Sequence, residues 1–277
     1  MTSRFSIEFF PPKTEAGAVR LLEVHQQWIG LGPEYCSVTY GAGGSTRERT
    51  LSTVMAMSSA SVPVAPHLSC IGDSRDSLQQ LLSTYRDMGI QRLVALRGDL
   101  PSGQVGLGEL PYAADLVRFI RESTDQQFHI EVAAYPETHP QADNFEQDLT
   151  YFLAKVHAGA NSAITQYFYN IDAYWHFCER VRKAGCFIDI VPGIMPITQY
   201  SNLMRFSEAC GAEIPRWLRK QLAAYADDQD SIRALGEDVV TRLCHKLLEQ
   251  GAPSLHFYTM NQLEPCHNIV VNLGLAT

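Results

Sequence analysis

A carboxyl group stands inside the first apolar run of this chain of 277 residues. Glu8 lies between Ile7 and Phe9, and aromatic side chains flank it on both sides. Loss of hydration in such surroundings should raise the pKa of the carboxyl, and a carboxyl that stays protonated near neutrality can act as a general acid. A carboxylate salt-bridged to a neighbouring strand is an equally reasonable interpretation, and position alone does not choose between the two.

A second polar segment, Arg97-Gly98-Asp99, follows another apolar run. Gly98 would let the backbone approach a flat ligand closely, and Asp99 would hydrogen-bond that ligand and set its electrostatics. An ordinary polar turn, in which Asp99 caps the residues that follow it, is the alternative. A glycine-rich segment at residues 41–44 lacks the lysine of a nucleotide P-loop, so we favour a tight turn that also allows a ligand to approach.

Two histidines, His67 and His139, also follow apolar runs. A metal site needs several clustered histidines and carboxylates, and only scattered candidates exist, so we predict no metal and interpret both histidines as hydrogen-bonding a ligand. The other histidines, His256 among them, show no such grouping. We interpret them as structural or surface residues.

Eight β-prone runs alternate with segments of helical spacing, and the polar residues above stand where these runs end. The runs are Phe5–Phe10, Tyr35–Tyr40, Val64–Cys70, Arg92–Leu96, His129–Tyr135, Ser162–Phe168, Phe187–Ile194 and Ser254–Met260. Eight alternations, in a chain near the usual size of roughly 250 residues, predict one α/β domain over residues 1–277, a closed (β/α)8 barrel. An open doubly wound sheet would carry a G-x-G-x-x-G fingerprint after its first strand, and none is present.

The helical segments carry further expectations. Ile232, Leu235, Val239, Leu243 and Leu247 form an apolar stripe, with Asp230 and Ser231 as candidate N-caps. An extra helix is expected around residues 214–225. In a parallel barrel the active site lies at the carboxyl ends of the strands, and strand alternation turns Glu8 toward that mouth.

The composition excludes several classes of protein. A formal net charge of -8 with scattered basic residues argues against nucleic-acid binding. Seven cysteines without a C-x-x-C pair favour buried thiols over disulfides or a metal cluster. No signal core or membrane-length apolar run is present, so we expect a cytoplasmic protein without a membrane partner.

Eight motifs, each at the end of a predicted strand, resemble those of the methylenetetrahydrofolate reductase family. The segments that carry the resemblance are Ser6–Lys13, Ser37–Gly44, Ala65–Cys70, Ala95–Pro101, Ala133–Pro140, Gly159–Gln166, Pro192–Pro196 and His256–Asn261. The resemblance covers nearly the whole chain. It implies a barrel that holds FAD at its mouth. NADH or NADPH would reduce the flavin, and the reduced flavin would pass hydride to methylenetetrahydrofolate.

The resemblance also implies roles for individual residues. Glu8 would be the general acid that helps to open the one-carbon bridge of the folate, and Asp99 would sit beside the flavin and contact the pterin. Folate or nicotinamide would be bound by Asp99, Gln166, Asn202, Phe206 and Gln262. FAD would be bound by Thr39, Tyr40, Ala42, His67, Arg97, Gly98, Asp99, Tyr112, Ala113, Tyr135, His139, Ala142, Asp148, Tyr151 and Lys155.

Three positions depart from the pattern of some relatives. Ala154 and Gln262 stand where some relatives have arginine, and Asn202 stands where some have glutamine. These changes motivate an alternative function, a flavin- or folate-binding subunit that takes electrons from a partner protein instead of a pyridine nucleotide. We expect a homo-oligomer of unspecified size. The sequence indicates neither a preference between NADH and NADPH nor the preferred folate glutamylation.

Overall fold

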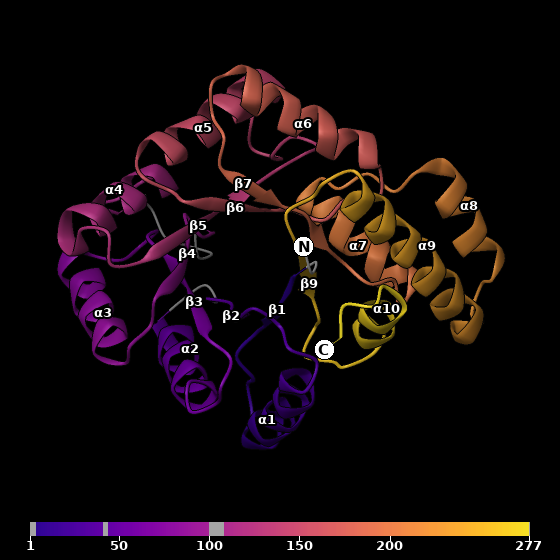
Figure 1. The fold of residues 1–277 in the computed structure, drawn as a ribbon, viewed down its shortest axis with the longest axis horizontal. Helices are drawn as coiled ribbons and strands as arrows, with labels where there is room; N and C mark the ends of the chain where they lie inside the picture. The colour runs from indigo at the N-terminus through magenta and orange to yellow at the C-terminus, as the bar shows by residue number, and fades with distance from the viewer. Residues whose placement is uncertain (1–3, 41–43, 100–107, 277) are drawn as a thin grey trace.

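The strands of this chain form a parallel barrel surrounded by helices, as the alternating pattern predicts (Figure 1). The computed structural model describes residues 4–40, 44–99 and 108–276, without the side chains of residues 44–46. The described strands are β1 (Phe5–Phe9), β2 (Cys36–Val38), β3 (Val64–Ser69), β4 (Arg92–Leu96), β5 (His129–Ala134), β6 (Ser162–Thr165), β7 (Asp189–Val191), β8 (Gly193–Ile194) and β9 (Leu255–Tyr258).

The order of the strands shows how the ring is built. Strands β1 to β7 pair in sequence, β9 pairs with β1, and β8 pairs with β9, all in parallel. The predicted seventh strand is therefore two short strands, β7 and β8, which pair with opposite neighbours and nearly close the barrel. They part at Pro192, which has no N–H for a sheet hydrogen bond but accepts one from the His256 N–H at 3.0 Å.

Helices cover the outside of the strands (Figure 1). Their bounds are α1 (Glu15–Ile29), α2 (Gly44–Met57), α3 (Arg75–Asp87), α4 (Ala113–Thr124), α5 (Phe145–His157), α6 (Ile171–Lys183), α7 (Tyr200–Cys210), α8 (Arg216–Ala224), α9 (Gln229–Glu249) and α10 (Cys266–Asn272). The extra helix expected around residues 214–225 is α8. None of the described helices is long and apolar enough to cross a membrane.

The start of α9 differs from the prediction. Asp228 is its N-cap, and the Asp228 carboxylate accepts hydrogen bonds from the backbone N–H and the hydroxyl of Ser231. Asp230 lies inside the first turn instead. Asp, Ser and Asn residues are all good N-caps, so a run that contains several of them does not indicate which one the backbone will use.

The molecule has two distinct interiors. Between strands and helices the side chains are almost all apolar, and Trp28, Phe152 and Phe257 are buried there. Inside the ring of strands a small apolar group of Tyr35, Ala65, Val94 and Ile164 lies among polar side chains. The buried polar residues of strands and strand ends include Ser6, Tyr35, Ser37, His67, Glu131 and His256. The buried polar side chains are therefore concentrated inside the ring of strands and at the strand ends.

Candidate active site

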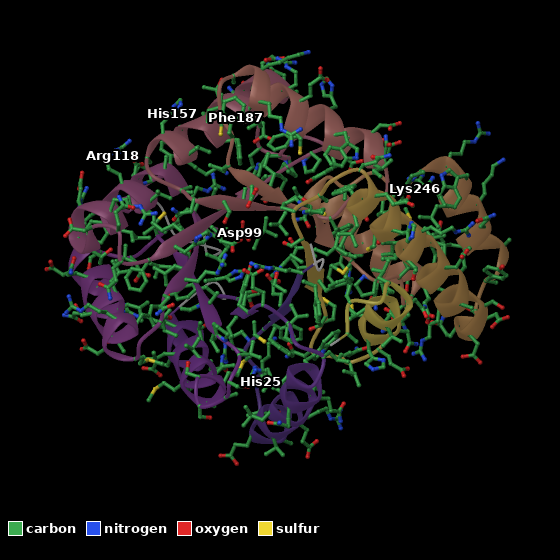
Figure 2. All side chains as sticks on the ribbon, viewed as in Figure 1. His25, Asp99, Arg118, His157, Phe187 and Lys246 are labelled. Carbon is green, nitrogen blue, oxygen red and sulfur yellow. The ribbon has the colours of Figure 1, made fainter. Side chains whose placement is uncertain are left out.

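The carboxyl ends of the strands bring most of the predicted site residues to one side of the barrel. Figure 2 shows Asp99 over the centre of the ring, whereas Arg118, His157 and Lys246 lie on the outer helices. This placement agrees with the rule that barrel active sites lie at the carboxyl ends of the strands.

Glu8 turns into the barrel, and three side chains from other strands meet it there. Its Oε2 atom lies 3.2 Å from Nε2 of His67 on β3 and 3.6 Å from Nε2 of His256 on β9. The Ser37 hydroxyl donates to the same oxygen at 3.5 Å. The Glu8 side chain keeps 18% of its surface exposed, so it is reachable from the mouth while its oxygen faces two imidazoles.

The expected direction of the Glu8 pKa shift is wrong for the chain without ligands. Burial alone raises the pKa of Glu8, but hydrogen bonds from His256 and His67 and the attraction of their charges outweigh burial and lower it to about 2. The salt-bridged alternative therefore describes this state better. Any acid role for Glu8 needs a source of protons beyond its own carboxyl.

The backbone around Glu8 is held by neighbouring strand ends. The Thr259 hydroxyl donates to the Glu8 carbonyl at 2.6 Å, and the Thr39 N–H donates to the Phe9 carbonyl at 2.8 Å. The Asn261 amide bonds both the N–H and the carbonyl of Phe10, at 2.9 and 2.8 Å. These bonds connect β1 with the ends of β2 and β9, so the position of the carboxyl is fixed by its neighbours.

A cationic group lies beside the carboxyl-terminal half of β5. The Lys155 ammonium on α5 donates to the Ala133 carbonyl at 2.6 Å. Burial lowers the pKa of Lys155 to about 8, against the opposing attraction of Asp148. Lys155 is half-buried, and removing part of an ammonium from water is costly unless an anion lies nearby.

Other predicted cofactor residues surround Lys155. The rings of Tyr135 and His139 meet edge to face with centroids 4.4 Å apart, and the His139 N–H donates to the Asp148 carboxylate at 2.9 Å. Burial lowers the pKa of His139, with opposing contributions from Asp148 and Asp99 and reinforcing ones from Arg97 and Lys155. These groups therefore share one electrostatic neighbourhood. The Ala142 N–H donates to the His139 carbonyl at 2.9 Å and closes the loop beside them.

The segment from Arg97 to Asp99 has a backbone that only glycine can provide. Gly98 has a φ of 84°, and a Cβ there would lie 1.9 Å from the Ser69 hydroxyl oxygen. That hydroxyl donates to the Arg97 carbonyl at 2.9 Å. The Arg97 guanidinium bonds the Gln141 side chain, and Asp99 is exposed. The close approach allowed by Gly98 is thus to Ser69, and it fixes the direction of the residues on either side.

The remaining predicted cofactor residues lie around the same mouth. Tyr112 and Tyr151 expose 56% and 52% of their surface, and Ala113 begins α4. The Tyr40 hydroxyl donates to Asp73 at 3.2 Å. Ala42 falls outside the described residues. Two exposed aromatic rings beside a cationic group suit a ligand that has flat and anionic parts.

The predicted substrate residues are more widely spread. Gln166 follows β6 at the mouth, while Asn202 and Phe206 lie on α7, where Phe206 is half-buried under the Arg205 guanidinium at 5.1 Å. Gln262 is exposed beyond β9, and its carbonyl accepts a hydrogen bond from the Trp28 indole at 3.4 Å.

Sequence reasoning missed His256, which it assigned to the structural or surface residues. His256 is completely buried, and its Nδ1 lies 2.7 Å from the Ser6 hydroxyl oxygen while Nε2 faces Glu8. One signal was available. Ser6 and Glu8 share a face of β1, His256 and Tyr258 share a face of β9, and these residues are partners in the register of the two strands.

Comparisons with known proteins agree with the sequence motifs. A family model described as Methylenetetrahydrofolate reductase matches residues 2–274. The 5,10-methylenetetrahydrofolate reductase of Escherichia coli K12 is 38% identical over 98% of this chain and 92% of its own length. The methylenetetrahydrofolate reductase (NADH) 1 of Arabidopsis thaliana is 39% identical over 98% of this chain, which spans 48% of that relative.

A solved structure supports the fold. An uncharacterised protein from Clostridium thermocellum, described as binding two copies of 5-methyl-5,6,7,8-tetrahydrofolic acid, superposes with a TM-score of 0.66. The alignment covers 99% of this chain and 93% of that protein at 17% identity. At this identity the likeness concerns the barrel alone.

Proposed function

The chain belongs to the methylenetetrahydrofolate reductase family, and from this membership we propose that it reduces 5,10-methylenetetrahydrofolate to 5-methyltetrahydrofolate. The hydride donor is NADH or NADPH, and the electrons pass through FAD. The observation that carries the proposal is the family match over the whole barrel, together with Glu8 at the mouth of that barrel.

The residues at the mouth fit FAD. Lys155 supplies a half-buried ammonium and Arg97 supplies a guanidinium nearby, so these two would hold the pyrophosphate. Tyr135 and His139 would line the same pocket, with the Gly98 backbone beside them. When bound, FAD accepts hydride from the pyridine nucleotide and supplies it to the one-carbon unit of the folate.

The protein's own contribution would be proton transfer and positioning. Glu8 would deliver a proton to the amine nitrogen that leaves the one-carbon bridge. Because His67 and His256 hold the Glu8 carboxyl ionised in the unliganded chain, the proton would reach the folate through Glu8 from an imidazole. Asp99 and Gln166 would bind the folate, and Phe206 would stack on the bound ligand.

The visible spectrum of the purified protein tests this function and its alternative. We expect the absorption bands of oxidised flavin, and we expect NADH or NADPH to bleach them under anaerobic conditions. A protein that binds no FAD would contradict the proposal. Bound flavin that neither nucleotide reduces would favour the alternative, a subunit that receives electrons from a partner protein.

A further inference from the structure

The connection between β3 and α3 carries a carboxylate, Asp73, to which the flavin and folate roles above assign no part. Asp73 stands directly before Ser74, the N-cap of α3. Its side chain is 23% exposed, and its own backbone N–H donates to the Cys70 carbonyl at 3.2 Å. Asp73 is therefore fixed beside the carboxyl end of β3, on the side of the barrel where the active site lies.

The Asp73 carboxylate accepts hydrogen bonds from two different elements. The Tyr40 hydroxyl, in the segment that follows β2, donates to Asp73 Oδ2 at 3.2 Å. The Ser77 hydroxyl, in the first turn of α3, donates to Asp73 Oδ1 at 3.4 Å. One carboxylate thus joins the end of β2 to the start of α3.

Arg47 on α2 supplies a positive charge to the same carboxylate. Its guanidinium lies 3.8 Å from Asp73 Oδ1, donates to the Ser77 carbonyl at 2.8 Å and also bonds the Ser77 hydroxyl. The Thr50 hydroxyl, one turn further along α2, donates to the Thr39 carbonyl at 3.1 Å. Because α2 is also attached through Ser77 and Thr39, its attachment does not depend on the Asp73 carboxylate alone.

The Tyr40 hydroxyl keeps its proton and donates it to Asp73. Burial and the charge of Asp73 raise the pKa of Tyr40, and the charge of Arg47 opposes them. A phenol has one proton to donate, and a hydrogen bond to a carboxylate is stronger than one to a neutral acceptor. Tyr40 would therefore meet a ligand with its ring, and its bond to Asp73 sets where that ring lies.

The negative charge of Asp73 is unexpected beside a site for an anionic cofactor. Tyr40 is among the residues expected to bind FAD, whose pyrophosphate is negatively charged. A nearby carboxylate repels such a ligand, so charge alone would disfavour an aspartate here. The bond to Tyr40 and the pairing with Arg47 give a reason for its presence.

We propose that Asp73 is a positioning residue of the flavin site, which holds the Tyr40 ring against bound FAD and has Arg47 as its counter-ion. Asp73 acts through Tyr40 and does not touch the cofactor. The proposal rests on the proposed function for the identity of that cofactor. It adds a residue that lies outside the segments that carry the family resemblance.

The affinity for FAD tests this role, because charge and positioning predict opposite changes. Asp73→Ala removes a negative charge, which by itself would strengthen the binding of an anionic ligand. We expect instead that FAD binds about 3–10-fold more weakly, since the Tyr40 ring loses the bond that holds it. Asp73→Asn keeps an acceptor oxygen for the Tyr40 hydroxyl and should restore most of the affinity.

Titration of the apoprotein with FAD, followed by flavin fluorescence, measures these affinities. Asp76→Ala is the matched control, since Asp76 is exposed in the first turn of α3. This variant removes the same charge from a neighbouring position and should not weaken the binding of FAD. An affinity that Asp73→Ala leaves unchanged or raises would overturn the proposal.

The variant Tyr40→Phe shows whether the two residues act through one bond. It keeps the ring and removes the hydroxyl, so by itself it should weaken FAD binding by a factor similar to that of Asp73→Ala. A chain with both substitutions should bind FAD no more weakly than the weaker single variant, because both changes break the same bond. Fully additive losses would contradict the proposal.

A further measurement needs neither FAD nor folate. Protein labelled with fluorotyrosine gives a fluorine NMR signal for Tyr40, identified as the signal that Tyr40→Phe removes. We expect Asp73→Ala to shift and broaden this signal and Asp76→Ala to leave it unchanged. An unchanged signal in Asp73→Ala would overturn the proposal. Weakened FAD binding in Asp73→Ala, together with no folate reduction by the wild type, would contradict the proposed function and support the role of Asp73.

Discussion

The charges at the two ends of the barrel are arranged differently. At the amino-terminal end, Arg92 lies between Glu131 and Glu34, and Arg4 lies 3.7 Å from Glu34, so two cations face two carboxylates. At the mouth, the half-buried Lys155 ammonium donates to a neutral carbonyl, and loss of hydration lowers its pKa to about 8. The paired network stabilises the fold, whereas loss of hydration at Lys155 costs stability, and an anionic ligand would offset that cost. A charge for which the chain supplies no ion-pair partner is therefore a candidate binding residue.

The largest effect on a reaction rate is expected for Glu8 at the mouth of the barrel. Glu8→Gln keeps the size of the side chain but cannot pass on a proton, so the folate half-reaction should slow by roughly 10²–10⁴-fold. Flavin reduction by NADH should be unchanged, as measured by anaerobic stopped-flow absorbance. Equal loss of both half-reactions would remove Glu8 from the proton transfer. The control Glu23→Gln, on the exposed face of α1, should alter neither step.

The second prediction tests the ion network at the amino-terminal end of the barrel. Arg92→Met leaves the Glu131 carboxylate buried without its cation, which should lower the free energy of unfolding by about 3 kcal/mol. Urea denaturation at neutral pH measures this change. Arg118→Met breaks only the exposed pair with Asp115 and should cost less than about 0.5 kcal/mol. If the two variants were equally stable, the network at the amino-terminal end would not be the paired structure described above.

The third prediction concerns Lys155, whose ammonium should destabilise the chain without FAD but strengthen the binding of FAD. The pKa of Lys155 falls from 10.5 to about 8 on folding, so stability rises with pH across that window and the full cost is present below pH 8. Lys155→Met should therefore stabilise the chain without FAD at pH 7 by about 1–2 kcal/mol. The same variant should bind FAD about 10–100-fold more weakly, because a charge-assisted bond is lost.

Thermal unfolding and FAD titration measure these two effects. Lys246→Met is the control, since Lys246 lies exposed on α9, far from the mouth in Figure 2, and should change neither quantity. Destabilisation of the unliganded chain by Lys155→Met would show that the ammonium is already satisfied by protein groups.

The smallest effect concerns Glu137 at the end of β5. Burial raises its pKa to about 7, against the backbone N–H of Glu213, which donates to it at 2.8 Å. The folded chain holds more protons than the unfolded chain between pH 4.5 and 7, so the carboxyl lowers stability as pH rises through that window. Glu137→Gln should be about 1 kcal/mol more stable than wild type at pH 8 and no more stable at pH 4. Urea unfolding at both pH values checks this, and an equal difference at both would contradict it.

Much of the fold could be predicted from local sequence. The alternation of β-prone runs and helical stripes is a property of neighbouring residues, so it predicted the barrel and α8. The break of the seventh strand at Pro192 was visible as a residue type, but its effect depends on which neighbours β7 and β8 pair with. The choice of Asp228 over Asp230 as N-cap likewise depends on the backbone path into α9.

Local sequence indicates which residues end the strands, but it does not indicate how side chains from different strands affect one another. The motif residues at strand ends lie on one side of the barrel because all of its parallel strands end there. The pKa of Glu8 was expected to rise, because its sequence neighbours are apolar, whereas His67 and His256 come from distant strands and lower it. Arg92 likewise meets Glu131 and the Tyr35 ring only when separate strands come together. Contacts that form only when the barrel closes cannot be inferred from the sequence of one strand.

One measurement tests the central claim most directly. Wild-type protein loaded with FAD is reduced by NADH under anaerobic conditions and then mixed with methylenetetrahydrofolate. We predict that the oxidised flavin bands return at a rate that depends on the folate concentration and that methyltetrahydrofolate forms in equal amount to the flavin reoxidised. Flavin that stays reduced, or that reoxidises without forming methyltetrahydrofolate, would contradict the proposed function.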